Sequence, residues 1–114
     1  MSQNPFPPVV HDFPRGATGA GSNAWISQSA THQVVFVEFD AGVESAPHSH
    51  GEQWGIVVEG LVDFTIGGRT VRCARGDTHH IPAGVVHSAR FMARTWMIEV
   101  FADADRYKAR SGEA

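Results

Sequence analysis

The sequence predicts an all-β protein of one domain, a barrel or sandwich of short strands in the jelly-roll arrangement. From residue 25 onward, short runs rich in Val, Ile, Phe, Thr and Trp alternate with turns that contain glycine. The pair Gly67-Gly68 between two of these runs is a signal for a two-residue β-hairpin. Helical periodicity is weak everywhere, and the only candidate helix is the tail at residues 102–110.

The elements follow in chain order. Residues 1–24 hold four of the six prolines and predict an irregular arm. We expect its apolar side chains, Phe6, Val9, Val10 and Phe13, to pack across a partner subunit. Residues 25–114 form the barrel and a short C-terminal tail. Nine strands are predicted, at residues 24–27, 33–39, 45–48, 53–59, 61–66, 69–73, 78–81, 87–91 and 95–101.

Composition limits the classes of function. The chain has 114 residues, of which 42% are hydrophobic and 18% charged, a balance typical of one globular domain. The net charge is −3 and no basic stripe is present, which argues against nucleic acid as a partner. Cys73 is the single cysteine and can form no internal disulfide. No apolar run reaches membrane-spanning length, so we expect a cytoplasmic protein that does not bind a membrane.

Three histidines indicate a metal site. His48 and His50 are two residues apart, so on an extended strand both imidazoles point to one face. His87 can complete the set from a neighbouring strand. Imidazole nitrogens are common ligands of divalent transition metals, which makes a metal inside the barrel the favoured interpretation. His11 and His32 are isolated and are interpreted as ordinary surface or core residues.

Two glycine-bracketed segments resemble the motifs of the cupin superfamily. The first family motif is Gly, five residues, His, one residue, His, a short gap, Glu, six residues and Gly. Gly42, His48, His50 and Gly60 match it, and Gln53 takes the glutamate position. The second motif is Gly, five residues, Pro, one residue, Gly, two residues and His, followed by Asn three residues later. Its matching positions are Gly76, Pro82, Gly84 and His87, with Phe91 in place of the asparagine.

The cupin resemblance covers residues 34–101 and implies a jelly-roll β-barrel, the double-stranded β-helix, with one divalent metal ion. The implied ligands are His48, His50, Gln53 and His87. Gln53 would bind through its amide oxygen, one residue closer to His50 than the family's glutamate usually lies. Glu52 is the rival ligand, but strand parity places it on the face opposite to Gln53. The resemblance leaves the metal open among Zn, Fe, Mn, Ni and Cu.

The chain is also similar to a small cupin family from pectin degradation that opens the ring of unsaturated uronate sugars. That family combines a His-x-His, Gln, His ligand set with an acidic residue and a phenylalanine on the last strand, followed by an arginine. The matching positions in this sequence are Glu99, Phe101 and Arg106, although Glu replaces Asp and Arg106 is offset by one or two residues. The resemblance implies that Glu99 is catalytic and that Phe101 and Arg106 bind substrate.

Strand parity leaves two orientations open. Met97, Glu99 and Phe101 share one face of the last strand, but the other face is equally apolar, so either could be the inner one. An inward Glu99 would be a lone carboxylate beside the metal, a usable general acid or base. His79 and His80 are adjacent, so at most one faces inward, and we take His80 as the candidate substrate contact.

The parity of the strand at residues 53–59 is clearer. Gln53, Gly55 and Val57 share one side, and the small size of Gly55 and Val57 would leave room above the metal for a substrate or water. Trp54 faces the other way and is a candidate for a subunit interface.

These features predict a metal-dependent enzyme that moves a proton on a small sugar-acid or carbonyl substrate, with isomerase or lyase chemistry. Three alternatives remain: an Fe(II) dioxygenase, a polyketide cyclase, and a non-catalytic cupin that binds a small ligand. Small cupins are usually dimers, so the resemblance also implies a homodimer.

Overall fold

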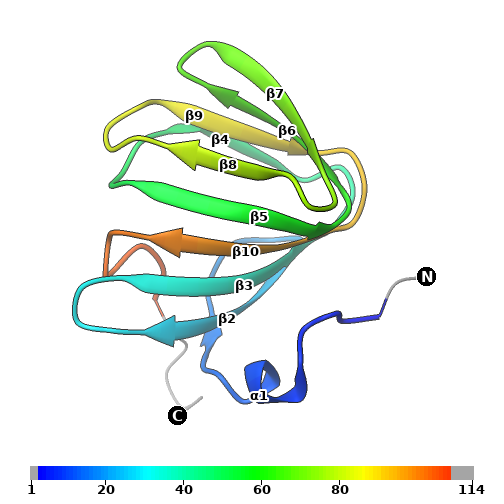
Figure 1. Cartoon of the computed structure of the whole chain (residues 1–114), viewed down its shortest axis with the longest axis vertical. Helices are drawn as coiled ribbons and strands as arrows, with labels where there is room; N and C mark the ends of the chain where they lie inside the picture. The colour runs from blue at the N-terminus through cyan, green and yellow to red at the C-terminus, as the bar shows by residue number, and fades with distance from the viewer. Residues whose placement is uncertain (1–2, 109–114) are drawn as a thin grey trace.

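The computed structural model describes residues 3–108 and shows two antiparallel sheets that face each other, as the sequence predicts (Figure 1). The larger sheet has six strands in the order β1-β2-β3-β10-β5-β8, and the smaller has four in the order β4-β9-β6-β7. The strands are β1 Arg15–Gly16, β2 Ser22–Gln28, β3 Gln33–Phe39, β4 Glu44–His48, β5 Gln53–Glu59, β6 Leu61–Ile66, β7 Arg69–Ala74, β8 Thr78–Ile81, β9 His87–Phe91 and β10 Thr95–Phe101.

Alternation along the strands builds the core between the two sheets. Within the larger sheet, Val35 pairs with Glu99 and Val37 with Met97, and all four point inward. From the smaller sheet, Val62, Phe64 and Phe91 complete the inner cluster. Because side chains on a strand alternate with a period of two, this register fixes which residues of β10 face the interior. The architecture is therefore the predicted jelly roll.

The hairpin between β6 and β7 confirms the Gly67-Gly68 signal. Ile66 pairs with Arg69 across the turn, and the two glycines have φ values of 56° and 85°. A two-residue turn of this kind requires positive φ at both central positions, which glycine adopts without steric cost.

The N-terminal arm packs on the outer face of its own larger sheet. It contains a short helix, α1 Pro8–His11, and the strand β1. Phe6 and Val10 are buried in a second cluster with Trp25 and Trp96, and the Phe6 ring meets the Trp96 ring edge-on at 5.6 Å between centroids. Val9 is exposed instead. Phe6 and Val10 thus contact their own chain, where the sequence suggested a contact across a partner subunit.

The helix predicted for the tail is wrong over residues 102–108. They form bends and turns, and residues 109–110 of that prediction lie outside the described residues. Side chains of the barrel hold this backbone instead: Gln33 donates to the carbonyl of Tyr107 at 2.6 Å and accepts from its N–H at 3.0 Å. Within residues 3–108, no helix is long and apolar enough to cross a membrane.

The packing of the arm makes a testable prediction. Phe6→Ala removes a buried ring from the outer cluster and should lower the free energy of unfolding by about 3 kcal/mol. Val9→Ala, an exposed position two residues into α1, should change it by no more than about 0.5 kcal/mol. Urea denaturation of both variants measures the difference. Equal stability of the two variants would contradict the packing of Phe6 on its own sheet.

Candidate metal centre

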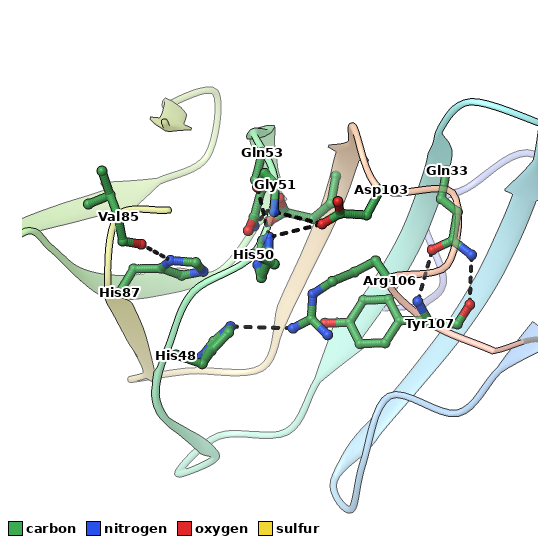
Figure 2. A network of polar contacts seen from close by, with 11 residues as sticks. Gln33, His48, His50, Gly51, Gln53, Val85, His87, Asp103, Arg106 and Tyr107 are labelled. Atoms are coloured by element: carbon green, nitrogen blue, oxygen red, sulfur yellow. Dashed lines mark hydrogen bonds and ion pairs between the residues drawn. The ribbon is translucent and has the colours of Figure 1, made fainter. Parts of the chain in front are cut away.

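The three predicted histidines converge at one end of the barrel (Figure 2). His48 ends β4 and pairs with His87 at the start of β9, while His50 lies in the turn that leads to β5. One ring nitrogen from each lies within 4.8 Å of the others. His87 is buried, and His48 and His50 are half-buried. The site therefore joins both sheets, and its geometry could hold a metal ion.

Backbone carbonyls fix the orientation of all three rings. The Nδ1 atom of His48 lies 2.7 Å from the carbonyl of Ala46, that of His50 2.8 Å from Gly51, and that of His87 2.9 Å from Val85. A carbonyl oxygen only accepts, so each Nδ1 must carry the proton. The lone pair is then on Nε2. This arrangement is the one that orients histidine ligands toward a metal.

The atoms left without partners fit a divalent ion. Nε2 of His50, Nε2 of His87 and Oε1 of Gln53 are buried and have no hydrogen-bond partner among the described residues. Buried polar atoms are nearly always paired, so three acceptors at one site without a protein partner fit an ion that accepts lone pairs. Three imidazole nitrogens and an amide oxygen suit Zn, Fe, Mn, Ni or Cu alike.

Electrostatics favour neutral imidazoles. Burial lowers the pKa of His50 and of His87, because a charged ring loses hydration inside the barrel. The hydrogen bonds to backbone carbonyls oppose this shift, while the Arg106 guanidinium and His48 lower both pKa values further and His50 also lowers that of His87. Only the neutral ring can bind a metal. At neutral pH these rings therefore need not lose a proton before they bind one.

A buried carboxylate orients Gln53. Glu99 faces the interior with 3% of its surface exposed, which decides between its two possible orientations. Nε2 of Gln53 donates to Glu99 Oε2 at 2.8 Å, and this bond fixes the amide so that Oε1 is the atom left without a partner among the described residues. Behind Glu99, Nε2 of the buried His79 lies 2.9 and 3.0 Å from the two carboxylate oxygens. Glu99 is thus held from two sides.

Gly55 makes room for this pair rather than for a substrate. A Cβ atom at residue 55 would lie 2.6 Å from Glu99 Oε2 and 2.6 Å from the His79 ring. The space that the sequence assigned to substrate or water beside the metal is therefore filled by these two side chains.

The prediction that His80 contacts the substrate is wrong, because His80 lies on the outer face of the sheet. Gly55 pairs with His79 and Trp54 with His80 across β5 and β8, and directly opposed residues share a face. The His80 side chain is 51% exposed on the outer face and lies 2.7 Å from the carboxylate of Glu52. Glu52, the rival ligand, therefore also lies outside the barrel. Trp54 is 42% exposed on that face, as parity predicted.

The chain after β10 places Arg106 at the site. Its Nη2 atom lies 3.3 Å from Nε2 of His48, and its guanidinium stacks on Tyr107 at 4.3 Å and on Phe101 at 5.6 Å. Nε2 of His48 has one lone pair, so it can bind either this N–H or a metal, but not both. Phe101 is buried and packs edge-on against the ring of His50.

A cavity of about 540 Å³ opens beside these residues between the two sheets. Its lining includes His48, His50, Gln53, His87, Glu99, Phe101 and Arg106. The cavity lies within the size range of small-molecule sites. Apart from His80, the predicted site residues thus share one cavity.

Sequence reasoning missed four residues that shape the site. His79 supports Glu99, Gln33 and Tyr107 anchor the tail, and Asp103 accepts from the Gly51 N–H at 2.7 Å beside His50. One signal was available: Gln33 is a polar residue at an inward position of an apolar strand. The inward orientation of His79 follows only from the register between β5 and β8, which the sequence alone does not reveal.

The two adjacent histidines provide a matched test. His79→Ala leaves the buried carboxylate of Glu99 without one of its donors and should cost about 3 kcal/mol of stability. His80→Ala removes an exposed pair with Glu52 and should cost no more than about 0.5 kcal/mol. Thermal and urea unfolding compare the variants. Equal losses would show that His79 and Glu99 are not a buried pair.

Comparisons with known proteins agree with this geometry. Residues 35–100, more than half of the chain, match the family described as "Cupin domain". No curated protein sequence matches the chain. Many solved structures do. One of them, KdgF from Halomonas sp., is 25% identical with a TM-score of 0.72, and the alignment covers 81% of this chain and 89% of that one.

Two further structures have the same fold. An RmlC-like cupin from Shewanella frigidimarina is 24% identical, with a TM-score of 0.73 and 91% of each chain covered. The SPY1581 protein of unknown function from Streptococcus pyogenes is 28% identical, with a TM-score of 0.65 and 72% of each chain covered. With the jelly roll, the two histidine motifs and the match over residues 35–100 in place, this chain belongs to the cupin family.

Proposed function

We propose that this protein is a metal-dependent enzyme that moves a proton on a small, oxygenated, carboxylate-bearing substrate, as an isomerase or lyase does. The observation that carries the proposal is the position of Glu99. A buried carboxylate lines the same cavity as the three histidines and is bonded to the amide that completes their set. The resemblance to uronate ring-opening cupins and the structural similarity to KdgF support the same class of chemistry.

His48, His50, His87 and Gln53 would hold the ion, through three Nε2 atoms and Oε1. A divalent ion bound there supplies a Lewis acid that polarises a carbonyl or hydroxyl oxygen. The ligand set is neutral, so the ion would keep its full charge. Proton transfer and substrate binding are assigned to protein side chains.

Glu99 is the group that would move the proton. Among the described residues its Oε1 accepts only from His79, which leaves a lone pair free for a proton of the substrate. The bonds from His79 and Gln53 prevent the carboxylate from rotating away. A fixed carboxylate within the cavity is what general acid–base catalysis requires.

Arg106 would bind the carboxylate of the substrate. Its guanidinium lies at the cavity, and the rings of Phe101 and Tyr107 hold its plane. Arginine pairs with carboxylates through two parallel hydrogen bonds, which fixes the orientation of the ligand as well as its affinity. Exchange of the His48 contact for a substrate carboxylate would also free the lone pair of that histidine.

A homodimer is part of the proposal. Trp54, exposed on the outer face of the larger sheet, supports an interface there, since large exposed aromatic residues are enriched at protein contacts. Light scattering of the purified protein tests this point, and a mass of one chain would contradict it.

The ligand assignment predicts the metal content of variants. His48→Ala and His87→Ala should each lower the retained metal at least about tenfold, because each removes one nitrogen ligand. His80→Ala, on the outer face, should retain as much metal as the parent protein. Elemental analysis measures the content, and circular dichroism verifies the fold. Parental metal content in the His48 and His87 variants would show that these residues are not ligands.

The role of Glu99 predicts a loss of turnover without a loss of metal. Glu99→Gln preserves the size of the side chain and an acceptor for Gln53 but cannot take a proton, so turnover should fall at least about 100-fold. Glu52→Gln changes an exposed carboxylate and serves as the control. The assay screens unsaturated uronates and carbonyl acids with proton exchange followed by NMR. Equal turnover in the Glu99 and Glu52 variants would remove Glu99 from the reaction.

A further inference from the structure

The cavity divides into a polar end and an apolar end, and the strand register orders the levels between them. At the polar end, Phe101 pairs with Gln53 on one side and Gln33 on the other. One inward step along β10 brings Glu99 opposite Val35, and the next brings Met97 opposite Val37. Along β9 the same direction leads from His87 through Ala89 to Phe91. Beyond Glu99, each step is therefore apolar.

The apolar end, which we call the distal chamber, is formed by side chains that all line the cavity: Val37, Phe39, Ala89, Phe91 and Met97. The rings of Phe39 and Phe91 stack at 4.1 Å between centroids at this end. None of the five offers a hydrogen-bonding side-chain group. The chamber can thus contact a ligand only through apolar surface.

Four hydroxyl-bearing side chains line the cavity, those of Thr18, Ser45, Ser49 and Tyr107. Ser49 and Tyr107 adjoin His48, His50 and Arg106 in the sequence and belong to the polar end, and the hydroxyls of Ser45 and Thr18 are bonded within the chain. Ser45 Oγ accepts from the N–H of Ala89 at 2.9 Å, and Thr18 Oγ1 lies 2.6 Å from Ser22 Oγ. Neither is a ready partner for several hydroxyls of a ligand. From Glu99 toward the apolar end, the cavity therefore has few hydrogen-bonding groups that could replace the water around a sugar.

This division determines what the site can bind. Apolar cavities tend to stay dry, so the apolar lining of the distal chamber gains most from contact with an apolar occupant. A polyhydroxylated ring would lose hydrogen bonds to water and find few replacements. A carboxylate head, in contrast, would meet Arg106 and the histidines at the other end.

We infer that the substrate is an amphipathic acid, with a carboxylate and a neighbouring oxygen at the histidine end and an aromatic or branched alkyl body in the distal chamber. This inference rests on the proposed function, because it concerns the same cavity. It narrows the substrate class away from polyhydroxylated sugar acids. Met97 suits such a body, since its flexible thioether adapts to aromatic surfaces.

Three acids with similar heads and different bodies test the inference. Isothermal titration of the zinc-loaded protein compares 3-phenyllactate, lactate and galacturonate, which carry a phenyl body, no body and a polyhydroxylated body. Burial of the phenyl ring should make the dissociation constant of 3-phenyllactate at least about tenfold lower than that of either other acid. Galacturonate binding as tightly as 3-phenyllactate would overturn the inference.

Two variants test whether the phenyl ring of 3-phenyllactate lies in the distal chamber. Val37→Phe fills the chamber and should remove the advantage of 3-phenyllactate over lactate, while the affinity for lactate and the zinc content stay unchanged. Ala89→Val, a smaller change, should reduce the advantage in the same direction and serves if the first variant does not fold. An undiminished advantage in a folded variant would place the phenyl ring elsewhere and overturn the inference.

The same titrations separate this inference from the proposed function. Contact of the phenyl ring with the chamber does not require a metal, so metal-free protein should also prefer 3-phenyllactate to lactate. A preserved preference together with full turnover in Glu99→Gln would overturn the proposed chemistry alone. Metal-dependent turnover of galacturonate without any preference for 3-phenyllactate would overturn the amphipathic substrate alone.

Discussion

The candidate centre depends on three hydrogen bonds between imidazole Nδ1 atoms and backbone carbonyls. These bonds fix the tautomer of His48, His50 and His87 and leave each Nε2 as the nitrogen with a free lone pair, and one ring nitrogen of each residue lies within 4.8 Å of the others. The carbonyls belong to residues one or two positions from each histidine, so the local chain path itself determines the ring orientation. Side-chain partners at the surface could move independently, whereas backbone partners on a barrel rim cannot. Burial lowers the pKa of His50 and of His87 and so favours their neutral forms.

A second series of hydrogen bonds lies behind the three histidines. His79 is bonded to Glu99, Glu99 accepts from the amide nitrogen of Gln53, and the amide oxygen is left without a partner in the cavity that the three histidines also line. The absence of a side chain at Gly55 makes this stack possible, because any Cβ there would collide with it. The glutamine thus depends on two residues that come from other strands. In the proposed enzyme, the same carboxylate would position a ligand and exchange a proton.

Much of this site could be predicted from the sequence because its information is local. The spacing of His48, His50 and His87 and the alternation in β5 predicted the converging histidines and the outward Trp54. The orientation of Glu99 could not be predicted, since both faces of β10 are apolar. The structure supplies the reason: Phe6 and Val10 of the arm cover Trp96 on the outer face, so that face is buried as well.

The other differences also come from long-range contacts. The choice between His79 and His80 depends on how β8 registers against β5, and no residue within β8 encodes that pairing. The tail at residues 102–108 has a weak helical pattern but gains more by bonding to Gln33 and to the carbonyl of Glu52. Local propensity is a weak determinant where tertiary hydrogen bonds compete for the same backbone groups.

The most direct test of the metal centre is a crystal structure of the purified protein with anomalous data at the absorption edge of the metal that it retains. We expect one ion, bound by Nε2 of His48, His50 and His87 and by Oε1 of Gln53, with Glu99 still hydrogen-bonded to the Gln53 amide. An ion bound through Nδ1 atoms, or one held by Glu99 or Glu52 in place of Gln53, would contradict this assignment.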